Sequence, residues 1–195
     1  MSKIKERYSN LQPQQNKIHM KKNVFVYGLI AGICITIFMS FSIAYCYAKN
    51  SFEGSMLLGY TAMLLSFSLI YVGVKNYRDR QQGGIISFKK ALGMALYMAL
   101  IASTLYVLGW MIAYYAFFPD FMDKLAAYQL SPEKTSQMTA SQVNGIRQQM
   151  ETFKQWYASP LGVAGATYME IFPVGLLVSL ITAVILKRKK ANITA

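Results

Sequence analysis

The chain has 195 residues, of which 54% are hydrophobic and only 14% are charged, and its formal net charge is +12. A soluble globular domain carries about 25% charged residues, so this composition argues against an ordinary soluble domain. The basic balance could indicate a nucleic-acid-binding protein, but no surface that interleaves aromatic and basic residues accompanies it, and we expect no nucleic-acid partner.

Four long, nearly charge-free segments account for the low charge. They span residues 24–47, 55–74, 92–118 and 161–186, and the third predicted helix begins near residue 88, so that it covers residues 88–118. A helix of about 20 apolar residues crosses roughly 30 Å of hydrocarbon, so each segment predicts a transmembrane helix. The sequence therefore predicts an all-α, polytopic membrane protein built as a four-helix bundle, whose principal partner is the lipid bilayer.

Polar segments flank this membrane domain, residues 24–190. Residues 1–23 are polar and are predicted to form a disordered cytoplasmic tail, and residues 191–195 form a second short tail. The apolar run after Lys22 is longer than the core of about 7–15 residues in a secretory signal, so we expect the first helix to be retained.

Small residues mark the faces along which these helices would pack. Ala91, Ala95, Ala99 and Ser103 recur at every fourth position of the third segment. Such a stripe lets helices approach closely, and we expect it to face the second or the fourth helix. The pair Gly28 and Gly32 offers the same chemistry, although glycine is also common in membrane helices without a packing role.

A basic hinge, residues 73–91, joins the second and third segments. Gly83 and Gly84 predict a turn, and Ser87 is placed to cap the next helix. Candidate contacts to lipid headgroups or to a partner within the hinge are Lys75, Tyr77, Arg78, Asp79, Arg80, Lys89 and Lys90. Asp79 lies between two arginines and is expected to be paired.

The distribution of Lys and Arg predicts an orientation. If the hinge faces the cytoplasm, fifteen of the 20 Lys and Arg residues lie on the cytoplasmic side and five on the other side. Positive residues near helix ends favour the cytoplasmic side. We therefore expect both termini in the cytoplasm and a place in the inner (cytoplasmic) membrane.

The segment 119–160 is the one sizeable polar stretch beyond the tails. Residues 120–128 form an amphipathic pattern, Ser131 followed by Pro132 predicts a helix start, and apolar residues repeat at helical spacing from Ser141. Forty residues cannot bury an independent core. We expect a short amphipathic helical cap on the non-cytoplasmic side, lying on the membrane or over the bundle.

Glu170 is the one acidic residue inside an apolar segment, about 13 Å into the last helix. Pro173 removes a backbone donor and frees the Met169 carbonyl, and Gly175 loosens the same stretch. An ionisable group at this depth is costly. The combination of an acid with a broken helix is found where membrane proteins bind ions or protons.

Three roles for Glu170 stay open. A protonated carboxyl could lock helix packing by a hydrogen bond, it could carry ions or protons, or it could contact a partner or lipid. Candidate hydrogen-bonding residues at matching depth are Tyr45, Tyr60, Thr61, Tyr106 and Tyr114. Transport pathways usually contain several polar groups at membrane depth, whereas this chain shows one charge there.

The sequence offers no set of residues for catalysis. His19 is the sole histidine and lies in the polar tail, so a Ser-His-Asp triad or a histidine-based metal site lacks parts. Cys34 and Cys46 lie on one predicted helix and are expected to be small apolar core residues. No phosphate-cradling loop is present. We expect no enzymatic activity, no cofactor and no metal.

Two stretches resemble a known family. They are Val72-Gly73-Val74-Lys75-Asn76-Tyr77-Arg78-Asp79 with Gly83-Gly84, Ile86, Phe88 and Lys90-Ala91, and Phe172-Pro173-Val174-Gly175-Leu176. Over residues 21–190 the chain resembles a bacterial membrane-protein family catalogued as a domain of unknown function, DUF4199. The resemblance implies a four-helix inner-membrane protein with both ends in the cytoplasm, and it supplies no activity and no catalytic residues.

The functional expectation is an integral membrane protein that acts as a structural or interaction component. The packing faces favour a homo-oligomer or a place in a larger membrane complex. The alternative is a small transporter or ion-linked carrier that uses Glu170 and the helix break at Pro173.

Overall fold

The structure is a computed structural model that describes residues 2–49, 52 and 55–188, with side chains from residue 18 onward except at 55, 56 and 58. These residues form seven α-helices and no strand. The helices are α1 (Ser2–Lys49), α2 (Ser55–Gln81), α3 (Phe88–Ala116), α4 (Phe121–Gln129), α5 (Pro132–Thr135), α6 (Ala140–Tyr157) and α7 (Pro160–Leu186). The expected all-α fold class is confirmed.

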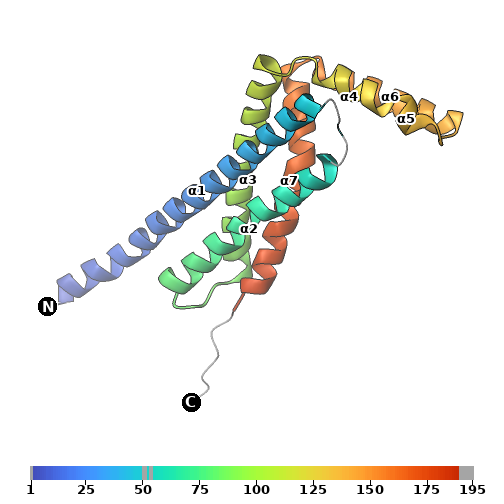
Figure 1. Ribbon diagram of the computed structural model, residues 1–195. Helices are drawn as coiled ribbons and strands as arrows, with labels where there is room; N and C mark the ends of the chain where they lie inside the picture. The colour runs from blue at the N-terminus through green and yellow to red at the C-terminus, as the bar shows by residue number, and fades with distance from the viewer. Residues whose placement is uncertain (1, 50–51, 53–54, 189–195) are drawn as a thin grey trace.

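Four long helices, α1, α2, α3 and α7, pack side by side (Figure 1). Contacts run from α1 to α2, from α2 to α7, from α7 to α3 and from α3 back to α1, and α2 also touches α3. We call the end that holds the α2–α3 connection the hinge end, and the opposite end, from which α4 and α6 extend, the hairpin end. The core between the helices is formed by apolar side chains such as Ile35, Phe67 and Met98.

The polar N-terminal segment is helical, which corrects the prediction of a disordered tail over residues 1–23. The backbone of α1 is helical from Ser2 and runs without interruption into the apolar part that ends at Lys49. Once the apolar part has formed a helix, each further residue adds one hydrogen bond, so the cost of nucleation is not met again. No glycine lies within residues 2–23, and the helical backbone continues through Pro13, the one residue there that cannot donate a backbone hydrogen bond.

The second helix also runs beyond the expected end at residue 74. α2 continues through Lys75 and Arg80 to Gln81, because Lys and Arg are good helix formers and only the following glycines stop it. Gly83 and Gly84 have φ angles of 60° and 82°, the left-handed region that glycine adopts without strain. The predicted turn is therefore confirmed at these two residues.

The predicted helix starts after Ser87 and Ser131 are confirmed, although the Ser131 side chain forms no capping hydrogen bond within the described residues. The Ser87 hydroxyl accepts a hydrogen bond from the backbone N–H of Lys90, as expected for the N-cap of α3. α5 begins at Pro132 after Ser131, and α7 begins at Pro160 after Ser159, whose hydroxyl accepts from Gly162 N–H at 3.1 Å. Proline suits the first position of a helix because its missing donor would be unpaired there.

The predicted small-residue faces lie at helix contacts. Ala91, Ala95, Ala99 and Ser103 are all fully buried. A Cβ placed on Gly175 of α7 would lie 3.1 Å from Ala99 Cβ, so the stripe on α3 faces the last helix, one of the two expected neighbours. A Cβ on Gly32 would lie 3.0 Å from Ala102 Cα, so Gly32 packs α1 against α3.

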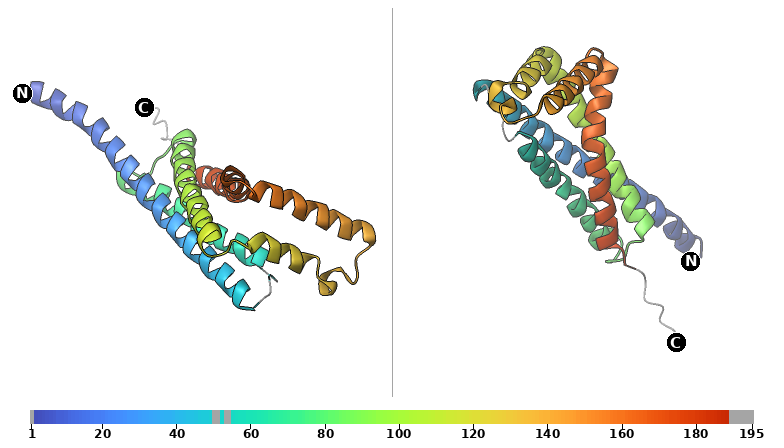
Figure 2. Two further views of the ribbon diagram at one scale, coloured as in Figure 1. Left: turned by 90° about the horizontal axis from the view of Figure 1, so that it is seen from above. Right: turned by 90° about the vertical axis from the view of Figure 1, so that its right-hand side faces the viewer.

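Helices α4 and α6 form an antiparallel hairpin that extends sideways from one end of the bundle (Figure 2). The side chains predicted at helical spacing, Val143, Ile146, Met150, Phe153 and Tyr157, are half-buried or buried, and Lys154 is the one other residue of α6 that is not exposed. Across the hairpin, Lys154 Nζ lies 2.8 Å from Asp123 Oδ1. Thr139 and Gln142 form a capping box at the start of α6.

The outside of the four long helices is largely apolar. Exposed side chains there include Phe41 on α1, Leu57 and Leu65 on α2, Ile112 on α3 and Leu177 on α7. Three helical segments within the described residues are long and apolar enough to cross a membrane: Ile18–Lys49, Phe88–Ala116 and Pro160–Leu186. The fourth expected span falls in α2, which is not among these three.

Candidate functional site

Glu170 lies on an outward face of α7. Its side chain is exposed, and Pro160 starts the helix about 15 Å away along the axis. Within the part of the chain whose side chains are described, the carboxylate forms no hydrogen bond and no ion pair. An acid is thus presented on the surface of a helix that is otherwise almost entirely apolar.

A strip of polar groups joins Glu170 to the hairpin end. The carboxylate lies close enough to Tyr106 of α3 and Tyr157 of α6 to act electrostatically on both hydroxyls. Tyr157 lies next to Thr167 of α7, whose hydroxyl donates to the Val163 carbonyl at 2.8 Å, and Trp110 Nε1 donates to the Tyr157 hydroxyl at 3.2 Å. Burial raises the pKa of Tyr157, and the nearby Glu170 carboxylate adds to the rise.

The hydrogen bond expected to lock Glu170 is not formed by any of the five predicted residues. Tyr106 is the one of them that the carboxylate influences. Tyr45 and Tyr60 are exposed on the outer faces of α1 and α2, and the Thr61 hydroxyl donates to the Leu57 carbonyl. The Tyr114 ring packs against Trp110, Tyr115 and Tyr157 instead.

Pro173 and Gly175 lie on different faces of α7, one exposed and one buried. The predicted helix break at Pro173 is not found, because α7 continues as one helix through this proline, whose ring is exposed on the side of Glu170. Gly175 is buried, and a Cβ there would lie 3.1 Å from both Ala99 Cβ and Phe67 Cζ. Glu170 and Pro173 therefore share an outer face, whereas Gly175 permits close packing of α7 on α2 and α3.

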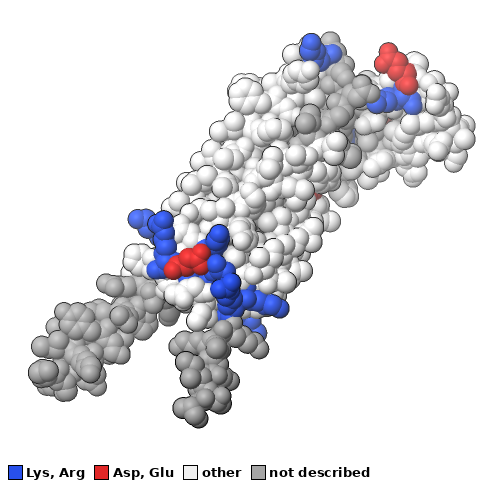
Figure 3. Space-filling model, turned by 60° about the horizontal axis from the view of Figure 1, so that its bottom comes forward, with Lys and Arg blue, Asp and Glu red and all other residues white. Residues whose placement is uncertain are grey.

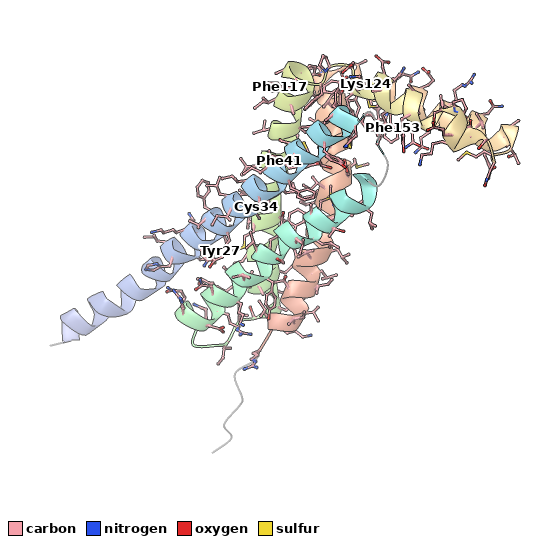
Figure 4. All side chains as sticks on the ribbon, viewed as in Figure 1. Tyr27, Cys34, Phe41, Phe117, Lys124 and Phe153 are labelled. Carbon is pink, nitrogen blue, oxygen red and sulfur yellow. The ribbon has the colours of Figure 1, made fainter. Side chains whose placement is uncertain are left out.

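An aromatic cluster at the hairpin end was not predicted as a unit. The Tyr47 hydroxyl at the end of α1 donates to Asp120 Oδ1 at 2.9 Å, and Lys124 Nζ lies 3.0 Å from Asp120 Oδ2 and 4.1 Å from the Tyr47 ring centroid. Phe121 stacks edge-on against Trp110 at 4.9 Å. Figure 4 labels Lys124 and Phe117 at this end, well away from Tyr27. In the sequence, the spacing of Asp120 and Lys124 by one helical turn could have predicted their ion pair.

Two residues of the hinge, Tyr77 and Lys90, contact other residues of the protein. Tyr77 is 1% exposed, its hydroxyl accepts from Gln82 Nε2 at 3.3 Å, and Lys90 Nζ lies 5.1 Å above its ring. Lys90 also donates to Gln82 Oε1 at 2.9 Å. Two of the predicted contact residues, Tyr77 and Lys90, are therefore engaged within the protein, and the third member of this triangle, Gln82, was missed by sequence reasoning.

The remaining hinge residues group around Asp79. Arg78 Nε donates to Asp79 Oδ1 at 2.6 Å, so the expected pairing of this carboxylate is confirmed. The hydrogen bond from Arg78, with the charges of Arg78, Lys75 and Arg188, holds the pKa of Asp79 below its usual range. Arg188 arrives from the end of α7, where its backbone N–H donates to the Ile86 carbonyl at 3.0 Å. Arg80 and Lys89 are exposed.

The described residues contain no group of three or more His, Cys, Asp or Glu side chains that could hold a metal ion. Cys46 is buried, as expected of a core residue, whereas Cys34 is exposed on α1, which corrects that expectation, and both are free thiols.

One comparison with known proteins is informative. The sequence model of a family described as "Protein of unknown function (DUF4199)" matches residues 26–188, which include both the hinge and the stretch around Glu170. The chain belongs to the DUF4199 family. No similar curated protein and no similar solved structure was found. The family assigns no activity, so the functional argument rests on the residues of this chain.

Proposed function

We propose that this DUF4199 protein is a non-catalytic, multi-pass membrane protein that acts as an interaction component of the inner membrane, with α2 as a fourth span. α2 has 27 residues, about 40 Å of helix, and it packs between α1 and α7 in the bundle. Its outward side chains, including Leu57, Leu64 and Leu65, are exposed and apolar. Such a surface suits lipid better than water.

The orientation follows from the charges at the two ends. On the face in Figure 3, Lys, Arg, Asp and Glu gather at the ends, and the surface between them is almost entirely uncharged. The hinge end carries the denser set of Lys and Arg, which favours the cytoplasmic side. Both termini and the hinge then lie in the cytoplasm, and the hairpin of α4 and α6 forms the cap on the opposite side.

The exposed, unpartnered Glu170 carries the proposal of an interaction role. A carboxylate facing hydrocarbon costs roughly 2.5–3.5 kcal/mol on insertion scales for comparable charged groups. A contact that supplies a hydrogen bond at this depth would remove much of that cost. The surrounding face of α7 is apolar, with Pro173 and Leu177 exposed on the same side, so another transmembrane helix fits it.

A second copy of this chain can supply both the transmembrane helix and the hydrogen bond to Glu170, so no other protein is needed. In a two-fold pair with both chains in one orientation, the α7 helices run parallel, and a residue that lies at the two-fold axis meets its own counterpart. Two carboxyls in contact can share one proton, because a protonated carboxyl donates to the other. Glu170 is therefore proposed to pair with Glu170 of the second copy.

Cysteine cross-linking tests this contact. In a variant with Cys34 and Cys46 replaced by alanine, Leu177→Cys places a thiol on the Glu170 face, and we expect a disulfide-linked dimer on mild oxidation in membranes. Leu65→Cys on α2 is the matched control, since both leucines are exposed, at 54% and 68%, and it should remain monomeric. Cross-linking at Leu65 but not at Leu177 would overturn the proposed contact.

The same background tests the role of the acid itself. Glu170→Gln keeps a side chain that can both donate and accept, so the cross-link at position 177 should persist. Glu170→Leu removes the hydrogen bond, which is worth about 1 kcal/mol in membranes, and should weaken association about fivefold in a dilution series. Equal association of both variants and the parent would exclude Glu170 from the contact.

A small proton-linked carrier is the second candidate, and one observation favours it. Tyr106 and Tyr157 lie within electrostatic reach of the Glu170 carboxylate, and Trp110 Nε1 donates to the Tyr157 hydroxyl on the side of the hairpin end. In liposomes with a pH gradient, a carrier would show proton-coupled flux that Glu170→Gln abolishes while the cross-link at Leu177→Cys is retained. If the parent protein shows no flux, the carrier function is excluded and the interaction role is the remaining candidate.

A further inference from the structure

The hairpin of α4 and α6 leaves the bundle where α7 begins. α7 has 27 residues, which gives it a length of about 40 Å. A bilayer with its headgroup regions is about 40–45 Å thick. With α7 spanning the membrane, the start of α7 and the hairpin attached to it lie at the level of the lipid headgroups. The hairpin runs sideways, across the direction of α7 (Figure 1).

One side of the hairpin carries its charges. Lys154 Nζ of α6 lies 2.8 Å from Asp123 Oδ1 of α4, so these two side chains meet on the same side. Arg147 and Glu151 precede Lys154 by seven and by three residues, which places all three on one face of α6. Arg147 and Glu151 are exposed. We call this side of the hairpin the charged side.

The charged side faces away from the bundle. Phe52, in the connection between α1 and α2, packs against Phe121 and Tyr128 of α4 with ring centroids 5.8 Å apart in both pairs. Phe121 precedes Asp123 by two residues, about 200° of helical rotation, so the two side chains point to opposite sides of α4. The side of the hairpin that is opposite to the charges therefore faces the level of the bundle.

On that side, α6 presents an exposed face without charge. Trp156 follows Lys154 by two residues and so points away from the charged side. Its ring contacts that of Phe153, and its side chain is 47% exposed. The other exposed residues of this Trp156 face, at helical spacing, are Gly145, Gln149 and Thr152. Figure 3, turned so that the bottom of Figure 1 comes forward, shows the hairpin as a mainly uncharged surface with charged side chains near its upper edge.

We propose that the Trp156 face of the hairpin is a membrane-binding surface, which lies on the phospholipid leaflet at the hairpin end. The amphipathic ring of Trp156 sits at the boundary between headgroups and acyl chains, where tryptophan is enriched. A helix with a charged side and an uncharged aromatic side lies in the plane of this interface. The Thr152 hydroxyl donates to the Gln148 carbonyl at 2.9 Å, so it requires no water.

Exposed apolar residues of α7 continue from the corner toward the middle of the bundle. Leu161, directly after Pro160, is 87% exposed, and Met169 on the same face is 73% exposed. The lipid that covers these residues reaches the corner from which the hairpin extends. The inference rests on the proposed membrane placement of the bundle, but it is independent of any contact between copies through Glu170.

Quenching of tryptophan fluorescence in liposomes tests the surface. The chain has two tryptophans, and Trp110→Phe leaves Trp156 as the sole emitter in the full-length protein. We expect phosphatidylcholine brominated on its acyl chains to remove most of the Trp156 emission, and aqueous iodide to remove little. If Trp110→Phe does not fold, as judged by circular dichroism, the difference between the parent and Trp156→Phe gives the same quantity, since Trp110 is 5% exposed.

A matched pair tests the sidedness of α6. In a background with both tryptophans replaced by phenylalanine, Gln149→Trp lies on the Trp156 face and Glu151→Trp on the charged side, and both positions are exposed. Brominated lipid should quench the first variant and iodide the second, in liposomes loaded with iodide on both sides. Equal responses of the two variants would overturn the proposal. Protection of Trp156 from both quenchers would also overturn it, because a protein contact would then cover this face.

Phe41→Trp in the same background separates this inference from the proposed membrane placement. Phe41 lies on the outer face of α1 and is 74% exposed. Quenching by brominated lipid at position 41 but not at positions 149 and 156 would overturn the membrane-binding surface and leave the placement of the bundle intact. Failure of brominated lipid to quench at position 41 would overturn both.

Discussion

Gly162 occupies a corner that has no room for a side chain. α6 ends at Tyr157 and α7 begins at Pro160, so the chain turns within two residues. A Cβ on Gly162 would clash with the backbone carbonyl of Trp156, which cannot rotate away as a side chain could. The direction of the hairpin relative to α7 therefore depends on this glycine.

We expect Gly162→Ala to lower the free energy of unfolding by about 1–3 kcal/mol, the usual cost of forcing extra atoms into packed structure. Gly165→Ala is the control, since a Cβ there meets no atom within 4 Å and alanine is the better helix former. Thermal unfolding in detergent, followed by the fluorescence of the two tryptophans, measures both. Equal midpoints for the two variants would show that the corner relaxes without cost.

The hydrogen bonds of the Asp120 carboxylate predict that the hairpin end becomes less ordered at low pH. The hydrogen bond from Lys124, and next that from Tyr47, hold the pKa of Asp120 below its usual range. A carboxyl whose pKa is lowered by folding stabilises the folded state above the unfolded-state pKa of about 4. That contribution is lost as the pH falls through the lower, folded-state value.

The measurement is near-ultraviolet circular dichroism of the aromatic cluster between about pH 5 and pH 2.5. The parent protein should lose signal as Asp120 is protonated, and the change should be small because the carboxyl is exposed to solvent. Asp120→Asn does not titrate and should show a weaker pH dependence over this interval. If the two proteins show the same pH dependence, protonation of Asp120 does not cause the loss of order.

At the level of the elements, periodicity and capping residues predicted the helices well. The third and fourth expected segments, 88–118 and 161–186, agree closely with α3 and α7 because their ends carry an N-cap serine or proline. The ends of α1 and α2 were misplaced, since a change from apolar to charged residues does not by itself end a helix. Only the glycines of the hinge end α2.

The direction of the hairpin lay beyond sequence reasoning. Its helices follow from a 3.6-residue period, but its orientation depends on contacts between distant residues, such as Phe52 with Phe121 at 5.8 Å and Trp110 with Tyr157. No local pattern encodes such pairs. The depth of Glu170 could likewise be predicted from its position in the apolar run, whereas its outward face depends on which sides of α7 meet α2 and α3.

For the whole molecule, the decisive question is whether α2 crosses the membrane, and the positions of three residues answer it. Lys49 ends α1, Gln81 ends α2 and Ser136 follows α5 in the hairpin, and all three are exposed. Four spans with the hinge in the cytoplasm place Lys49 and Ser136 outside and Gln81 inside. If α2 did not cross, Lys49 and Gln81 would lie on the same side.

Single-cysteine variants at these positions, in the background lacking Cys34 and Cys46, can be labelled with a membrane-impermeant maleimide. In intact cells with a permeable outer envelope, Lys49→Cys and Ser136→Cys should react, and Gln81→Cys should react only after lysis. Leu64→Cys, exposed on the apolar face of α2, should resist labelling in both states because a thiol in hydrocarbon does not ionise. Labelling of Gln81→Cys in intact cells together with Lys49→Cys would reduce the bundle to three spans, and it would place the hinge cations on the side of the membrane opposite to the one that their number favours.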